Sequence, residues 1–142
     1  MTALDLDNLA DRFQRCTISK PEWTHPVHLQ VGAWHVHRFG AEESARLLRN
    51  GIRRLNDHHA TPNSDMRGYH ETITIAYVRL ISAFLAAQNA PIELAVEHML
   101  ASELAAKGHL LKFYSQPLLM SVLVLMSVLA RKEWVEPDIA PL

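Results

Sequence analysis

Apolar residues recur three and four positions apart along most of the chain, among many Ala, Leu, Arg and Glu residues. This spacing places the apolar side chains on one face of an α-helix. No Asn-Gly or Asp-Gly pair lies between two alternating apolar runs, so the usual signature of a β-hairpin is missing. The chain is therefore predicted to be all-α, a single-domain bundle of about six to seven helices over residues 1–142.

Capping and breaking residues set the limits of these helices. Thr24 is a preferred N-cap residue, and Pro26 then lies in the first turn, where its missing N–H is harmless. Gly40 ends that helix, because glycine is favoured just after a helix C-terminus. The predicted helices cover about Leu4–Arg15, the stretch from the Thr24 cap to Phe39, Ala41–His59, Tyr69–Ala87 and Pro91–Leu100, a short helix opening at Ser102 and Glu103, and a last helix with Pro117 in its first turn.

The segments between the helices differ in composition. Cys16–Trp23 is a short connection. Thr61–Gly68 is the longest polar stretch and contains Pro, Asn, Ser, Asp and Gly, which favour turns, so we predict that it is the functional loop. The tail Trp134–Leu142 contains Pro137 and Pro141 and is expected to be extended on the surface.

Charge and cysteine content exclude several functions. The 14 Lys and Arg residues nearly balance the 15 Asp and Glu residues, for a formal net charge of −1. This balance lacks the positive excess that drives binding to nucleic acid or to anionic membranes, so neither is expected as a partner. The single cysteine, Cys16, cannot form an intrachain disulfide, which points to the reducing cytoplasm.

The longest apolar run, Pro117–Ala130, is interrupted by Ser121 and Ser127 and is shorter than the ~20 residues that span a bilayer. It is predicted to be a buried helix. The stretch Leu118–Leu129 carries more large aliphatic residues than one face of a peripheral helix requires, so we also expect a homodimer that buries part of it.

Nine histidines stand out in the composition, and three of them are predicted to face inward. His25 and His28 lie three positions apart on one helix, and His70 lies near the start of another, each on the apolar side. The two helices are therefore expected to be neighbours. Three imidazoles at one place would hold a divalent ion, zinc first and iron or manganese as alternatives, with an open position for water or substrate.

The residues beside His70 supply the predicted catalytic groups. Glu71 could be a fourth metal ligand or a general base that acts on metal-bound water, and Tyr69 is the second predicted catalytic residue. A ligating imidazole needs a hydrogen-bond partner for its other nitrogen. The candidate partners are Glu22, Asp57 and Asp65. The competing interpretation is that the histidines are core residues bonded to neighbouring carbonyl or hydroxyl groups.

Other charged and aromatic positions have simpler interpretations. His58 and His59 end a predicted helix, where a cation meets the helix dipole favourably, so a capping role is expected. Arg46, Arg49 and Arg53 form a stripe that could receive an anion, but a solvated helix face is the favoured interpretation.

The strings EWTHPVHL (Glu22–Leu29) and GYHETIT (Gly68–Thr74) resemble a pair of motifs in a family of small bacterial helical proteins of about this length. The resemblance covers most of the chain and supplies no activity. The chain is also similar to the DinB/YfiT helical bundles, which hold a divalent ion with three histidines, and this similarity implies a metal site. Those bundles usually have a late His-x-x-x-His pair that this chain lacks after His70, so their thiol-transfer or hydrolase activities do not carry over.

Two functions follow as predictions. The first is a small metal-dependent enzyme, hydrolase-like or hydratase-like, in which His25, His28 and His70 hold the ion and a small-molecule substrate enters beside the Thr61–Gly68 loop. The second is a non-catalytic helical module in which the same histidines line a ligand pocket or satisfy the core. The metal content of the purified protein separates the two.

Overall fold

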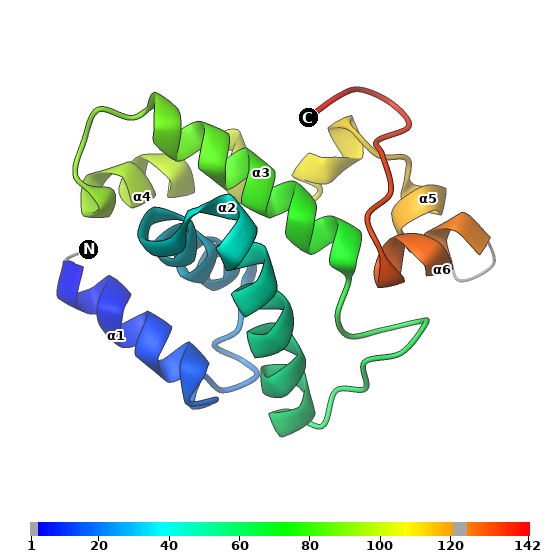
Figure 1. The fold of residues 1–142 in the computed structure, drawn as a ribbon, viewed down its shortest axis with the longest axis horizontal. Coiled ribbons are helices and arrows are strands. Elements are labelled where there is room, and N and C mark those ends of the chain that lie inside the picture. The colour runs from blue at the N-terminus through cyan, green and yellow to red at the C-terminus, as the bar shows by residue number, and fades with distance from the viewer. Residues whose placement is uncertain (1–2, 121–124) are drawn as a thin grey trace.

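The computed structural model describes residues 3–120 and 125–142. Over these residues the protein has six α-helices, two short 3₁₀ helices and no strand, so the all-α prediction is confirmed (Figure 1). The elements are α1 (Ala3–Gln14), α2 (His25–His58), α3 (Glu71–Ala87), α4 (Ile92–Leu100), η1 (Glu103–Ala105), η2 (His109–Lys112), α5 (Gln116–Met120) and α6 (Leu125–Lys132).

Helix α2 consists of two arms that meet at Gly40. The backbone there has φ 80° and ψ 171°, a conformation outside the helical range that glycine adopts without a Cβ clash. Figure 1 shows the two arms running in different directions. The predicted break at Gly40 is therefore confirmed, and the second arm ends at His58 with His59 as its C-cap residue.

The first arm of α2 packs against α3, as the predicted helix pairing requires. The ring of His25 lies 5.3 Å from the ring of Tyr77, in an edge contact. About two turns further along α2 and one turn further along α3, a Cβ added to Gly32 would lie 3.0 Å from the Ile81 side chain. The absence of a side chain on Gly32 lets the two helices approach closely at this level.

The main core lies between α1, both arms of α2, α3 and α4. Its deeply buried side chains include Phe13, Leu29, Leu55, Ile81 and Met99. In Figure 1, α4 lies near the C-terminal end of α3, and α5 and α6 lie near its N-terminal end. The N-terminal end of α3 is therefore the place where the main core meets the C-terminal segments.

A second, smaller core joins α3 to the C-terminal segments. It comprises Ala76, Leu110, Tyr114 and Leu119. The tail after α6 has no regular structure and crosses this region, where Trp134 packs on the cluster and the Tyr114 hydroxyl donates to the Val135 carbonyl at 2.6 Å. The Thr72 hydroxyl of α3 donates to the Glu133 carbonyl at 2.8 Å, so the C-terminal segments are held to α3 by apolar contacts and by a hydrogen bond.

The predicted last helix corresponds to α5 and α6, and residues 121–124 between them lie outside the described residues. Part of the predicted dimer surface, Leu118–Leu129, falls on those residues. Within the described part Leu119 and Ser127 are buried in the same chain, and Met120 is exposed, so the homodimer stays a prediction. Among the described helices, none has the length and apolar character needed to cross a membrane.

Candidate functional site

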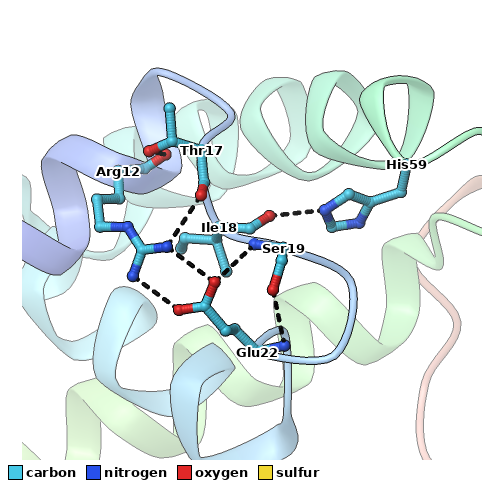
Figure 2. Close-up of polar contacts among 6 residues, drawn as sticks. All are labelled: Arg12, Thr17, Ile18, Ser19, Glu22 and His59. Atoms are coloured by element: carbon cyan, nitrogen blue, oxygen red, sulfur yellow. Dashed lines mark hydrogen bonds and ion pairs between the residues drawn. The ribbon is translucent and has the colours of Figure 1, made fainter.

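The connection between α1 and α2 is tied to both neighbouring helices (Figure 2). The Arg12 guanidinium donates to both carboxylate oxygens of Glu22 at 2.8 Å, and to the Thr17 carbonyl at 2.9 Å. The backbone N–H of Ser19 also donates to Glu22, at 3.1 Å. These hydrogen bonds, with Arg12 the largest contributor, lower the pKa of Glu22 to about 2. Glu22 therefore pairs with Arg12 and, within the described part of the chain, does not contact an imidazole as predicted.

A histidine from the end of α2 closes the same connection from the other side. The Nε2–H of His59 donates to the Ile18 carbonyl at 2.7 Å, a contact that Figure 2 shows. The connection is thereby held between α1 and the second arm of α2. The aromatic residue of this connection, Trp23, stacks on His28 in the first part of α2.

Trp23 lies between two rings, and one of them is His28. The Trp23 ring centroid is 5.5 Å from that of Phe13 and 3.7 Å from that of His28, both in stacked arrangements. The Nδ1–H of His28 donates to the Thr24 carbonyl at 2.6 Å. Burial lowers the pKa of His28 to about 4 despite that carbonyl, so the ring is neutral at pH 7 and its Nε2 is a hydrogen-bond acceptor.

His25 is bonded to a different part of the chain. Its Nε2–H donates to the Leu104 carbonyl at 3.1 Å, which links the start of α2 to η1. This contact and the edge contact with Tyr77 fix the ring orientation. His25 and His28 therefore line the same cavity but donate to carbonyls of different segments, η1 and the residue before α2.

His70 uses both ring nitrogens within the protein. The sequence predicts that His70 lies within the helix. Helix α3 begins at Glu71, so His70 is instead its N-cap residue. Its Nδ1 accepts from the Ile73 N–H at 3.2 Å, and its Nε2–H donates to the Leu119 carbonyl at 3.0 Å. Burial outweighs that carbonyl and lowers the pKa of His70 to about 4. The neutral ring thus joins α3 to α5 and has no free nitrogen lone pair.

The three predicted metal ligands are therefore not arranged as a ligand set. His25, His28 and His70 each donate to a backbone carbonyl. Over residues 3–120 and 125–142, no group of three or more His, Cys, Asp or Glu side chains is placed to hold a metal ion. The two other candidate partners are also occupied elsewhere: Asp57 accepts from Asn63 at 3.2 Å, and Asp65 pairs with Lys132 at 3.0 Å.

The predicted catalytic residues form a closed polar network. The Glu71 carboxylate accepts from Arg49 Nε at 2.9 Å and Nη2 at 2.6 Å, and from the Tyr69 hydroxyl at 2.5 Å. Burial alone would raise the pKa of Glu71, and the bonds from Arg49 and Tyr69 outweigh it and lower the pKa. Burial and the Glu71 carboxylate raise the pKa of Tyr69. Glu71 is thus an ionised, buried partner of Arg49.

The arginine stripe on α2 differs from the predicted solvated face. Arg49 pairs with Glu71, and the Arg53 guanidinium lies 5.0 Å above the Tyr69 ring. Arg46 pairs with Glu43 on the exposed surface. Two of the three arginines therefore contact the Tyr69–Glu71 segment, which the spacing of the arginines alone does not reveal.

Two of the three histidines line one open groove of about 510 Å³. The groove lies between the α1–α2 connection, the second arm of α2, the predicted functional loop and the start of α3. Its lining comprises Lys20, Trp23, His28, Ile52, Asn56, His59, Thr61, Gly68, Tyr69, His70, Ile73 and Thr74. The structure thus brings His28, His70 and Tyr69 together as walls of a groove, with the loop ends at its edge.

A narrower apolar cavity of about 110 Å³ shares part of this wall. The shared residues are Trp23, His28, Ile52, Ile73 and Thr74. The inner wall adds side chains of the first arm of α2 and of α3, among them His25, Leu29, Tyr77 and Ile81. His28 therefore stands at the junction between an outer groove that carries several polar side chains and an apolar inner cavity.

Part of the lining carries no signal in the sequence. Lys20, Ile52 and Asn56 carry no motif, and their shared position depends on how distant segments meet. Trp23 and His28 belong to the EWTHPVHL string, and Gly68, Tyr69, His70, Ile73 and Thr74 belong to the GYHETIT string. These two strings are the local signals that mark most of the rest of the lining.

Comparisons of the chain with protein families, with curated proteins and with solved structures give no match. The resemblances to small bacterial helical proteins and to the DinB/YfiT bundles stay predictions.

Proposed function

We propose that this protein is a helical module that binds a small molecule in the groove at His28. The observation that carries the proposal is the groove of about 510 Å³, which shares His28 with an apolar cavity. Sites for small molecules are usually concave, have volumes of ~300–1,000 Å³, and combine apolar walls with a few polar groups of fixed orientation. The groove has each of these properties.

The walls of the groove are held rigidly before any ligand arrives. Trp23 is stacked between Phe13 and His28, and Arg12 and His59 hold the connection that carries it. A site that is already ordered loses little conformational entropy on binding. The proposed ligand is a small molecule with an apolar part for the inner cavity and a polar part for the outer groove.

A blocked variant and its matched control test this function. Ile73 lines both the groove and the inner cavity, whereas Ile75, on the same helix, lines neither. We expect a fragment library, screened by saturation-transfer NMR, to give hits on the native protein that Ile73→Trp loses and Ile75→Trp retains. An absence of hits, or equal binding to both variants, would contradict the proposal.

The alternative is a zinc-dependent hydrolase or hydratase, or an iron or manganese enzyme, with His25, His28 and His70 as ligands and Glu71 and Tyr69 as catalytic residues. It has less support, because each ring would have to leave its backbone carbonyl and Glu71 would have to leave Arg49. Elemental analysis of protein purified without a His-tag decides it. Stoichiometric divalent metal that is lost on His70→Ala would favour the enzyme.

A further inference from the structure

The hydrogen-bonding groups of the groove are unevenly used. At His28, the N–H is taken by the Thr24 carbonyl, and the neutral ring leaves Nε2 as an acceptor at the junction of groove and cavity. Stacking on Trp23 and the bond to Thr24 prevent the ring from turning its donor outward. His28 therefore offers an acceptor to a ligand.

Asn56 is in the same situation, and its amide orientation is fixed by its neighbour Asn63. The Asn63 Oδ1 accepts from the Tyr69 N–H at 2.9 Å, while Asn63 Nδ2 donates to Asp57 at 3.2 Å and to the Arg53 carbonyl at 3.3 Å. Asn56 must therefore present its Nδ2 to Asn63 Oδ1, at 3.0 Å. Its Oδ1 is then left as an acceptor, and the second N–H of its Nδ2 is left as a donor.

Two further lining residues donate to the backbone as well. The Thr74 hydroxyl donates to the His70 carbonyl at 2.9 Å, and the His59 Nε2–H donates to Ile18. The Thr74 oxygen keeps an acceptor lone pair. The donors in the described lining are the Lys20 ammonium at the exposed outer part, the Trp23 indole N–H and the second amide N–H of Asn56, and the hydroxyls of Thr61 and Tyr77 can donate or accept.

We infer that the ligand is an uncharged molecule with an apolar body and at least two N–H or O–H donors on one edge, in the class of primary carboxamides or amino-substituted heterocycles. This inference rests on the proposed binding function. The apolar body fits the inner cavity, and the donor edge meets the acceptors of His28, Asn56 and Thr74. A ligand that brings only acceptors would leave these groups without hydrogen bonds after they lose water.

Three probes of nearly equal size separate the possibilities. Benzamide has two N–H donors, acetophenone replaces its amino group with a methyl group, and benzoate has only acceptors and a negative charge. Titrations monitored by saturation-transfer NMR on the native protein should show benzamide binding roughly tenfold more tightly than either of the others, the effect of about one good hydrogen bond.

Variants of His28 test whether its Nε2 accepts the hydrogen bond from the ligand. In His28→Asn the side-chain amide can still donate to Thr24 but lacks an acceptor at the Nε2 position, so the preference for benzamide should fall to about twofold or less. His28→Gln places an amide oxygen near the Nε2 position and should retain more of the preference. His37→Asn, on an exposed position of the same helix, should leave it unchanged.

The outcomes separate this inference from the binding function. Equal or tighter binding of acetophenone or benzoate would overturn the inference and leave the groove as a binding site. Failure of all three probes would also overturn the inference, while the wider fragment screen tests the groove itself. If His28→Asn does not fold, the ¹⁵N shift of His28 Nε2 in the native protein replaces it: benzamide should move that signal, and an unchanged signal would contradict the inference.

Discussion

The two sides of Tyr69 use their polar groups in different ways. On one side, the Tyr69 hydroxyl and Arg49 donate to Glu71, so that charges and hydrogen bonds are satisfied within the protein. On the other side, His28 and Asn56 donate inward and leave acceptors along a groove. One network is closed and charged, and the other is open and neutral.

This difference assigns a structural role to the network of Glu71 and a ligand-binding role to the groove at His28, although both adjoin Tyr69. A buried carboxylate is costly unless a cation and hydrogen bonds compensate it, so Glu71 is committed to Arg49. In the neutral His28 ring, Nδ1–H is bonded to the Thr24 carbonyl and, among the described residues, Nε2 has no partner that the fold requires. His28 can therefore accept a hydrogen bond from a ligand without loss of a contact that the fold needs.

The largest expected effect concerns the closed network. Arg49→Ala leaves the Glu71 carboxylate, which is 12% exposed, without its cation and should lower the free energy of unfolding by about 3 kcal/mol. Arg46→Ala is the matched control, because its pair with Glu43 is largely exposed and should contribute nothing measurable. Urea unfolding at pH 7 compares the two variants. Equal losses of stability in the two variants would show that the burial of Glu71 adds no cost to the loss of its cation.

Much of the fold could be predicted from the sequence because its signals are local. Apolar spacing identifies the helices, Gly40 marks the break in α2, and Pro91 marks the start of α4, whose first helical residue is Ile92. The same local signals place the start of α3 at Tyr69, whereas the helix begins at Glu71. That shift of two positions makes His70 a capping residue.

The site could be predicted only in part, because its partners are distant along the chain. Periodicity indicates correctly that His25, His28 and His70 face inward, but not what they meet there. His25 donates to Leu104 and His70 donates to Leu119, 79 and 49 residues away. These carbonyls belong to segments whose position depends on the packing of the whole chain, so no spacing rule reveals them.

The second prediction uses pH to test the neutral histidines. His28 and His70 have pKa values of about 4 in the folded protein and an ordinary value near ~6.5 when unfolded. Below pH 6.5 the unfolded chain takes up protons that the folded chain does not, so stability falls as the pH drops toward 4. For both groups together, the loss between pH 7 and pH 5.5 should be about 2.5 kcal/mol.

Urea unfolding at several pH values measures this loss. His70→Asn should reduce the slope between pH 7 and pH 5.5, because its titrating ring is gone, while His28 and the buried His35 and His109, whose pKa values are also lowered, keep their contributions. Few carboxylates titrate in that interval, which keeps their contribution small. A stability that is flat from pH 7 to pH 5.5 would show that the two rings are not buried as neutral groups.

A smaller effect is expected from the cap of α3. His70→Asn keeps an oxygen that can accept from the Ile73 N–H but leaves the Leu119 carbonyl without its donor, which should cost about 1 kcal/mol at pH 7. His70→Ala also removes the cap and should cost about 1 kcal/mol more. Thermal unfolding of the two variants measures the difference. Identical stability of the two would mean that the cap contributes nothing.

The smallest effect is expected at the α1–α2 connection. Glu22→Gln removes an ion pair with Arg12 that is open to solvent, so the urea midpoint should barely change. The groove should respond more than the global stability does, because this contact holds the segment that carries Trp23 (Figure 2). Weaker binding of fragment hits with an unchanged midpoint is the expected result. Unaltered binding would show that the contact does not order the groove.

The central claim is that the histidines bond to the protein backbone and that His28 keeps one acceptor for a ligand. Long-range ¹H–¹⁵N NMR of the imidazoles at pH 7 tests it directly, with and without added Zn²⁺. The predicted result is a neutral His28 protonated at Nδ1 and a neutral His70 protonated at Nε2, both unchanged by zinc. A joint shift of the ring nitrogens of His25, His28 and His70 on addition of stoichiometric Zn²⁺ would contradict the account and favour the metal enzyme.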